Sequence, residues 1–322
     1  MKSALVLGGA GFIGHHMVRR LKKDGFWVRS VDLKYPEFGP SEADEFIRGD
    51  LRSQATCLEV INRRFDEIYQ FAADMGGAGY IFTGENDADI MHNSALININ
   101  VLKACEVSDS KNIFYSSSAC VYPRHNQADP DNPNCEESSA YPADPDSQYG
   151  WEKLFSERLY LSYAKNKGFR VRIGRYHNIY GEEGTWRGGK EKAPAAICRK
   201  IAELGDEGEV EIWGDGLQTR SFLYIDDCIK GTLKVMRSEF QGPFNIGSEK
   251  NISINELVLM VASIARKRVT IKNVQGPEGV RGRNSDNKLI SLKVGWAPEC
   301  ELEQGLETTY AWVEKQLVGA KA

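Results

Sequence analysis

A tyrosine and a lysine in the middle of the chain have the spacing of a proton-transfer pair. Tyr149 and Lys153 lie four residues apart in YGWEK, so a helix would place both side chains on one face. A tyrosine that acts as a base near neutrality needs its pKa lowered from about 10 by about three units, or roughly 4 kcal/mol. A nearby ammonium and a positive nicotinamide ring could together supply that stabilisation in a cleft that excludes water.

A serine and a cysteine end an apolar run upstream of this pair. In YSSSACVYP (115–123), Ser118 and Cys120 follow a strand-like segment. Residues two apart in an extended segment point the same way, so we expect both side chains to face one cavity. Ser118 would bind a substrate hydroxyl beside Tyr149. Packing is the ordinary role of a buried cysteine, but the pKa of a free thiol, about 8.5, also suits acid–base work near neutrality.

A glycine-rich turn near the N-terminus has the context of a dinucleotide site. GGAGFIG follows a strand-like run and leads into a helical pattern. In such a motif Gly8 permits a tight turn, Gly11 lets the backbone approach a pyrophosphate, and Gly14 allows close packing of helix on sheet. The N–H groups at the start of the helix would bind the anion.

Two aspartates follow the next strands. Asp32 ends the second strand, where its carboxylate would accept hydrogen bonds from ribose hydroxyls and repel a 2′-phosphate, which favours NAD over NADP. Asp50 follows the third strand, and we expect it near the adenine.

Strand-like and helical runs alternate through the first half of the chain. This alternation predicts a parallel sheet that is covered on both faces. The second half is less regular and richer in glycine loops. We therefore predict an α/β, Rossmann-type doubly wound sheet with a smaller mixed α/β lobe over its carboxyl edge. The NAD-binding domain would be 1–174, to which 219–245 returns, and the nucleotide-sugar-binding lobe would be 175–218 and 246–322.

The bulk composition describes a soluble globular protein. The 322 residues carry a formal net charge of −4, which gives no general attraction to nucleic acid or to an anionic membrane. The first residues lack the pattern of a signal peptide, and no apolar run is long enough to span a bilayer. The seven cysteines have no CxxC spacing, which argues against a disulfide framework and a zinc site. We expect a reduced, cytoplasmic protein without a metal.

Taken together, the glycine motif, the serine-rich strand end and the Tyr–Lys pair resemble the extended short-chain dehydrogenase/reductase superfamily of NAD-dependent nucleotide-sugar epimerases and dehydratases. The resemblance covers nearly the whole chain. It implies NAD bound through the cycle and a homodimer in which helices near 92–107 and 149–167 form a four-helix bundle. The implied NAD contacts, beyond the glycines and aspartates, are Phe12, Ile13, Leu51, Ala72, Tyr149 and Lys153.

Longer strings resemble the GDP-mannose 3,5-epimerase family, among them AADMGGAGYIF, SSACVYP, GTWRGGKEKAPAAICRK, WGDGLQTRSF and GPEGVRGRNSDN. That resemblance implies that Tyr149, assisted by Lys153 and Ser118, removes the C4 hydroxyl proton of the sugar while hydride passes to NAD. Cys120 and Lys192 would then exchange protons at C5 and C3. The implied reaction converts GDP-D-mannose to GDP-L-galactose, or to GDP-L-gulose when only C5 inverts.

The same resemblance implies a set of substrate contacts. Arg220 and Arg283 suit a diphosphate through bidentate hydrogen bonds. Gly76 and Gly77 would let the backbone approach the sugar closely. The other implied contacts are Ser118, Ala119, Cys120, Asn178, Glu191, Lys192, Ala193, Lys200 and Gln218.

Other functions stay open at this point. In the resembling 4,6-dehydratases an acidic pair follows the serine, whereas this chain has Ala119 and Cys120. A plain 4-epimerase has no stated use for Cys120 with Lys192, and a GDP-heptose could replace GDP-mannose as substrate. A non-catalytic NAD-binding protein should have lost Tyr149 or Lys153, and both are present.

Overall fold

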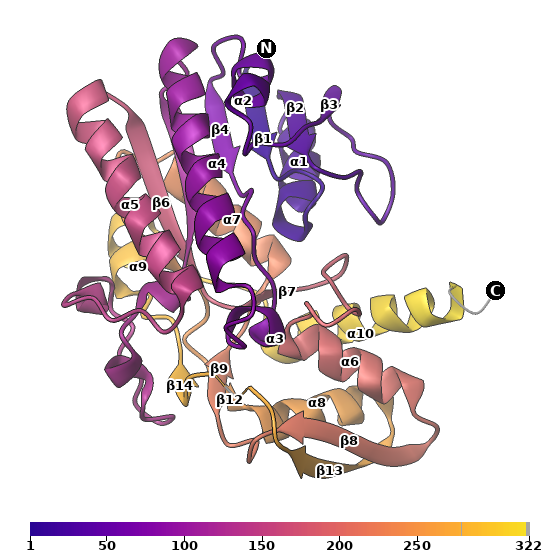
Figure 1. Cartoon of the computed structure of the whole chain (residues 1–322). Helices are drawn as coiled ribbons and strands as arrows, with labels where there is room; N and C mark the ends of the chain where they lie inside the picture. Colours follow the sequence, from indigo (N-terminus) through magenta and orange to yellow (C-terminus); the bar gives the residue numbers. More distant parts are fainter. Residues whose placement is uncertain (278, 320–322) are drawn as a thin grey trace.

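The computed structural model describes residues 1–277 and 279–319 and has a seven-stranded parallel sheet at its centre (Figure 1). The strand order is β11-β6-β5-β4-β1-β2-β3. The bounds are β1 (Ser3–Leu7), β2 (Trp27–Asp32), β3 (Glu45–Arg48), β4 (Glu67–Gln70), β5 (Asn112–Ser118), β6 (Arg170–Tyr176) and β11 (Phe244–Ile246). The order reverses between β1 and β4, and a doubly wound sheet opens a ligand crevice at such a point. The predicted fold class is confirmed.

Helices cover both faces of this sheet (Figure 1). Along β1, Ala4 and Val6 pack in one hydrophobic cluster with α1 and α7, whereas Leu5 and Leu7 pack in another with α2 and α4. Because side chains alternate along a strand, this apolar run supplies both layers. The helices are α1 (Phe12–Lys23), α7 (Ile225–Met236), α2 (Gln54–Val60), α4 (Asp87–Val107) and α5 (Gln148–Lys167).

A smaller lobe occupies the lower part of Figure 1. Its helices are α6 (Ala193–Glu203), α8 (Ile254–Ala265) and α10 (Leu302–Gly319), and they pack with the strand pair β8 (Glu207–Trp213) and β13 (Arg268–Val274) around one apolar core. Short strands lie between lobe and sheet, namely β9 (Thr219–Ser221), β12 (Asn251–Ser253) and β14 (Gly282–Arg283) in one small sheet and β7 (Ile179–Tyr180) with β10 (Leu223–Tyr224) in another. The other helical segments are α3 (Ala78–Ile81), α9 (Lys288–Val294) and the 3-10 turns η1 (Ala119–Val121), η2 (Arg124–Gln127) and η3 (Glu137–Ala140).

Segments on both sides of the predicted boundaries contact the other part of the chain. The segment 219–245 does bring α7 to the sheet, but β9 at its start pairs with β12 and β14 instead. Ile290 of α9 and Trp296, which fall in the predicted lobe, are buried in the core formed by β1, α1 and α7. A seven-residue helix between glycine-rich loops carries no periodic signal that could have placed it.

Two further features concern the helices and the cysteines. Within the described ranges, no helix combines the length and apolar character needed to cross a membrane. All seven cysteines are free thiols, and six of them are buried.

Candidate active site

Helix α5 presents Tyr149 and Lys153 at the carboxyl end of β5. The Ser147 hydroxyl accepts a hydrogen bond from Gly150 N–H at 3.2 Å and caps the helix, so the pair lies in its first two turns. Lys153 Nζ donates to the Ser116 carbonyl oxygen at 2.9 Å and lies 5.5 Å from the centre of the Tyr149 ring. Both side chains are buried.

The protein environment alone does not lower the pKa of Tyr149. Burial raises that pKa, and the negative charges of Cys120 and Glu152, when ionised, raise it further, whereas the Ser118 hydroxyl acts in the opposite direction. Burial also lowers the pKa of Lys153. The Lys153 ammonium is thus itself desolvated, and it is directed at the Ser116 carbonyl oxygen.

Ser118 and Cys120 both line the cavity, but not for the predicted reason. The chain is not extended here: Ser118 ends β5 and caps the 3-10 turn η1, and its hydroxyl accepts a hydrogen bond from Cys120 N–H at 3.2 Å. The turn η1 therefore places the Cys120 thiol next to the Ser118 hydroxyl. Burial is the main cause that raises the pKa of Cys120, followed by the charge of Asp146.

Lys192 reaches the same cavity from the lobe. It occupies the N-cap position of α6, two residues before Pro194. Burial lowers the pKa of Lys192, while the charge of Cys120 acts to raise it. The thiol and the amine are thus close enough to influence each other although 72 positions separate them in the chain.

The cavity between sheet and lobe has a volume of about 400 Å³. Its lining includes Tyr149 and every residue that the sequence analysis predicted as a substrate contact: Gly76, Gly77, Ser118, Ala119, Cys120, Asn178, Glu191, Lys192, Ala193, Lys200, Gln218, Arg220 and Arg283. A pocket of this size suits a small ligand. Sequence reasoning missed other lining residues, among them Phe82, Tyr176, Arg199, Trp213 and Phe222. Only the folded chain brings these together, and no motif marked them.

The two glycines at 76 and 77 serve the chain's own packing. A Cβ on Gly77 would lie 2.4 Å from the Glu191 carbonyl oxygen, and one on Gly76 would lie 2.6 Å from Cβ of Tyr80. Gly77 N–H also donates to the Lys190 carbonyl oxygen at 3.0 Å. The close approach that requires glycine here is therefore to the loop that carries Lys192.

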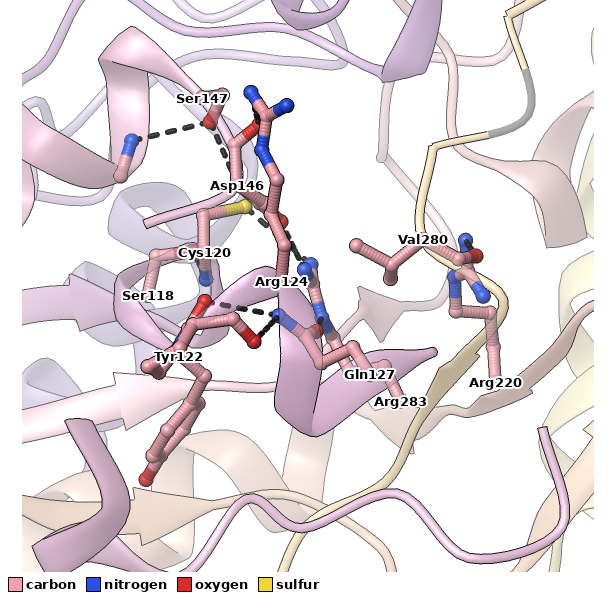
Figure 2. Close-up of polar contacts among 12 residues, drawn as sticks. Ser118, Cys120, Tyr122, Arg124, Gln127, Asp146, Ser147, Arg220, Val280 and Arg283 are labelled. Atoms are coloured by element: carbon pink, nitrogen blue, oxygen red, sulfur yellow. Dashed lines mark hydrogen bonds and ion pairs between the residues drawn. The ribbon is translucent and has the colours of Figure 1, made fainter. Parts of the chain in front are cut away.

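The two arginines at the cavity have different surroundings (Figure 2). Arg220 donates to the backbone carbonyl oxygens of Thr219 and Val280, and burial, together with the like charge of Arg283, lowers its pKa to about 9. Arg283 forms an ion pair with Asp146, which sequence reasoning did not single out. The charges of Asp146 and Cys120 act in the opposite direction on Arg220, and Arg283 has Asp146 as its ion-pair partner.

Polar groups of the lobe complete the wall. Gln218 donates to the Trp213 carbonyl oxygen at 3.0 Å, but its own side-chain oxygen is buried without a hydrogen-bond partner among the described residues. Glu191 pairs with Arg199 at 3.3 Å, and Asn178 donates to the Ser221 carbonyl oxygen at 2.9 Å. The unsatisfied oxygen of Gln218 is an acceptor for a donor group of a ligand.

The predicted glycine turn lies at the switch point between β1 and β4, where a doubly wound sheet opens its crevice. Gly8 has a φ of +82°, and a Cβ there would lie 2.7 Å from Ala72 N. A Cβ on Gly14 would lie 2.1 Å from the Gly8 carbonyl oxygen. Gly11 is the N-cap of α1, and within the described part of the chain no side chain caps that helix start. The turn, the close packing and the uncapped helix end fit the pyrophosphate of a dinucleotide.

The acidic and apolar residues that the sequence predicts as further cofactor contacts have different surroundings. Asp32 accepts a hydrogen bond from Ala10 N–H at 3.0 Å, which holds its carboxylate beside the glycine turn. Asp50 instead forms an ion pair with Arg52 at 2.7 Å, and this contact lowers its pKa. Leu51 is buried in the core beside β1 and β2. Phe12 and Ile13 are partly buried at the start of α1, against the opposite core.

Comparison with known proteins agrees with this arrangement. Residues 4–247 match the NAD dependent epimerase/dehydratase family. A GDP-mannose 3,5-epimerase of Arabidopsis thaliana is 47% identical over 319 residues, covering 98% of this chain and 83% of that protein.

Solved structures of sugar-nucleotide enzymes share the fold. UDP-glucose 4-epimerase from Thermotoga maritima, solved with UDP-glucose, has a TM-score of 0.85 at 25% identity and covers 98% of this chain and 99% of its own. MoeE5 in complex with UDP-glucuronic acid and NAD has a TM-score of 0.80 at 25% identity, covering 98% and 100%. With the glycine turn, the Ser–Tyr–Lys set and these matches together, the chain belongs to the NAD-dependent epimerase/dehydratase family and, within it, to the family of the GDP-mannose 3,5-epimerases.

Proposed function

We propose that this protein is a GDP-mannose 3,5-epimerase that converts GDP-D-mannose to GDP-L-galactose, with GDP-L-gulose as the product of inversion at C5 alone. One observation carries the proposal: Tyr149, Cys120 and Lys192 line a single cavity. A phenol suited to hydroxyl chemistry thus lies beside two further groups that can exchange protons with carbon. A simple 4-epimerase has no use for the second pair.

The reaction begins at the C4 hydroxyl of the sugar. Bound NAD supplies the hydride acceptor and donor for C4, and its pyrophosphate and ribose would be held by the glycine turn and Asp32. Tyr149 takes the hydroxyl proton and later returns it, with the Ser118 hydroxyl at the same oxygen. Burial raises the pKa of Tyr149, so its deprotonation would need a nearby positive charge, which an oxidised nicotinamide ring would supply when NAD is bound.

Cys120 and Lys192 then move protons at the neighbouring carbons. A ketone at C4 makes the hydrogens on C3 and C5 acidic, because the resulting carbanion is stabilised as an enolate. One group of the pair removes a proton from one face of the ring, and the other delivers a proton to the opposite face, so the centre inverts with no net change in protons. Burial favours the uncharged form of both groups, in which the thiol can give a proton and the amine can accept one.

The nucleotide would lie along the lobe side of the cavity. Arg220, which is partly buried, would supply a positive charge for the diphosphate, and the side-chain oxygen of Gln218 would supply an acceptor. Asn178, Glu191 and Lys200 would make further polar contacts with the substrate. The same groups would hold a GDP-heptose that differs only beyond C6.

We further propose that the protein works as a cytoplasmic homodimer. On the outer faces of α4 and α5, Ile99, Trp151 and Phe155 are 44%, 40% and 48% exposed. A second copy packed there would bury these side chains in a four-helix bundle, which is the arrangement that the sequence resemblance implies. The partners we expect are otherwise small molecules, with no nucleic acid and no membrane.

Product analysis tests the proposed function. The purified protein is incubated with GDP-D-mannose and, in parallel, with UDP-glucose, and the nucleotide sugars are separated and identified by NMR. We expect GDP-L-galactose and GDP-L-gulose from GDP-D-mannose and no turnover of UDP-glucose. A 4-keto-6-deoxy product would instead identify a dehydratase, and an unchanged GDP-D-mannose pool would contradict the proposal.

A further inference from the structure

The thiol of Cys120 accepts a hydrogen bond from a guanidinium that is fixed on all sides (Figure 2). Arg283 Nη1 lies 3.4 Å from Cys120 Sγ, and its Nη2 donates to the carboxylate of Asp146. Arg283 Nε donates to Gln127 Oε1 at 2.6 Å. Arg283 and Asp146 are both buried. These three contacts give the guanidinium one orientation relative to the sulfur.

Asp146 and Gln127, the hydrogen-bond partners of Arg283, are themselves fixed by further hydrogen bonds. Ser147 Oγ donates to Asp146 Oδ1 at 2.7 Å, and Arg124 donates to the Asp146 backbone carbonyl oxygen at 3.1 Å. Gln127 Nε2 donates to the Tyr122 carbonyl oxygen at 2.9 Å. The network therefore joins the segment before α5, the turn η2 and the strand β14, all next to the cysteine turn η1. A charged network this well satisfied keeps its geometry while a substrate binds.

Charged and titratable groups from several elements face the sulfur. They are Asp146, Tyr149 and Lys153 at α5, Arg283 on β14, Arg220 on β9 and Lys192 at α6. Asp146 and Arg283 act on Cys120 with opposite signs: the carboxylate raises the pKa of the thiol, whereas the guanidinium, by its charge and its hydrogen bond, lowers it. The two members of one ion pair thus set the proton affinity of the thiol from opposite directions.

We propose that Arg283 is a catalytic residue that donates a hydrogen bond to the sulfur of Cys120 and stabilises its thiolate, and that Asp146 and Gln127 are positioning residues that orient this guanidinium. The proposal rests on the proposed function in giving Cys120 an acid–base role. It assigns Arg283 to the thiol, in place of the diphosphate contact that the sequence resemblance implies. The diphosphate then falls to Arg220.

The pKa of Cys120 tests this assignment without any turnover. Alkylation of Cys120 by iodoacetamide is followed between pH 6 and pH 10 by peptide mass mapping, which distinguishes it from the six other thiols. We expect Asp146→Asn to move the titration to lower pH and Arg283→Gln to move it to higher pH, each by about one unit. The matched control is Asp144→Asn, which removes an exposed carboxylate two residues from Asp146 and should leave the titration unchanged.

A second pair of variants guards against misfolding. Asp146→Asn combined with Arg283→Gln removes both charges and leaves no buried charge unpaired, so this variant should fold and titrate between the two single variants. Gln127→Ala, which leaves both charges in place, should reduce kcat more than it raises KM for GDP-D-mannose. Shifts of the single variants in the same direction, or no shift in either, would overturn the assignment.

Failure of this inference and failure of the proposed function have different signatures. Opposite shifts of the thiol titration in a protein that leaves GDP-D-mannose unchanged would retain the network and reject the epimerase. If the protein converts GDP-D-mannose but the thiol titration is unchanged in both variants, the epimerase function is retained. Arg283 would then be assigned to the substrate.

Discussion

At the scale of single residues, the cavity holds acid–base groups whose uncharged forms burial favours. Cys120 has its pKa raised, Lys192 has its pKa lowered, and Tyr149 has its pKa raised. When the amine takes a proton from carbon and the thiol gives one to carbon, an ammonium and a thiolate result, and each charge compensates the other. Each group should therefore be needed for a different part of the reaction.

Cys120→Ala should separate proton exchange at carbon from cofactor binding. We expect epimerisation to fall by about 10²–10⁴-fold, the range for loss of a general acid or base, with NAD affinity unchanged. Initial rates and NAD titration measure the two effects. Tyr149→Phe is the companion variant and should lose the oxidation at C4 as well, seen as no change in nicotinamide absorbance. Wild-type epimerisation by Cys120→Ala would remove the thiol from the mechanism.

His177 should make the protein sensitive to acid. The side chain is fully buried, with Nε2 2.8 Å from Asn245 Oδ1, and burial lowers its pKa to about 3. The unfolded chain binds this proton near pH 6.5, so the stabilisation is complete above that pH and is lost as the pH falls towards 3. Between pH 7.5 and pH 5 the loss amounts to about 2 kcal/mol.

Urea unfolding at the two pH values measures that loss. We expect His177→Gln to lose about 2 kcal/mol less than the wild type between pH 7.5 and pH 5. His125→Gln, at an exposed histidine, is the control and should behave as the wild type does. An equal loss in wild type and His177→Gln would show that another group is responsible.

At the scale of elements, the connection from β1 to α1 positions the cofactor. The turn brings the start of α1 so close to β1 that a Cβ on Gly14 would lie 2.1 Å from the Gly8 carbonyl oxygen and 2.8 Å from Gly9 Cα. These are backbone atoms, which cannot rotate away. The helix must therefore move if a side chain is added, and its N–H groups would move with it.

Gly14→Ala should weaken NAD binding and destabilise the fold together. We expect a loss of about 1–3 kcal/mol in stability, the usual result of forcing extra volume into a packed site, and at least a tenfold weaker NAD affinity. Thermal unfolding and calorimetric titration with NAD measure the two effects. Gly205→Ala, where nothing lies within 4 Å of the added Cβ, should leave both unchanged. Unaltered NAD affinity in Gly14→Ala would place the cofactor elsewhere.

Elements with local signals could be predicted from the sequence, whereas contacts between distant segments could not. The glycine turn, α5 with its Tyr–Lys spacing and the strands of the parallel sheet carry periodic or short-range patterns. The ion pair of Asp146 with Arg283 joins residues 137 positions apart, and no local sequence pattern links the two. The contacts that Gly77 makes with Glu191 and Arg283 makes with Cys120 escape sequence reasoning for the same reason, since these partners come from other loops.

At the scale of the whole molecule, one surface has the features of an interface. Ile99, Trp151 and Phe155 are exposed on the adjacent helices α4 and α5, whose inner faces are joined by hydrogen bonds from Asn98 to Glu152 and Ser156. The inner contacts fix the two helices relative to one another. The outer apolar side chains are then presented on a rigid pair of helices.

Phe155→Glu should convert the proposed dimer to a monomer. A charge at the centre of an apolar helix–helix contact would be buried without a partner, which costs more than the contact gains. Analytical ultracentrifugation measures the mass, with 36.0 kDa for one chain. Leu292→Glu, at a residue 80% exposed on α9 and away from this surface, is the control and should leave the mass unchanged. A dimer that survives Phe155→Glu would place the interface elsewhere.

The central claim is that this molecule exchanges the carbon-bound hydrogens next to a transient ketone. The most direct measurement is NMR of the sugar recovered after incubation of the protein with GDP-D-mannose in heavy water. We expect deuterium at C3 and C5, none at C4, and no label at any of these carbons with Lys192→Ala or Cys120→Ala. Wild-type protein that returns sugar with deuterium at neither C3 nor C5 would contradict the proposed proton exchange.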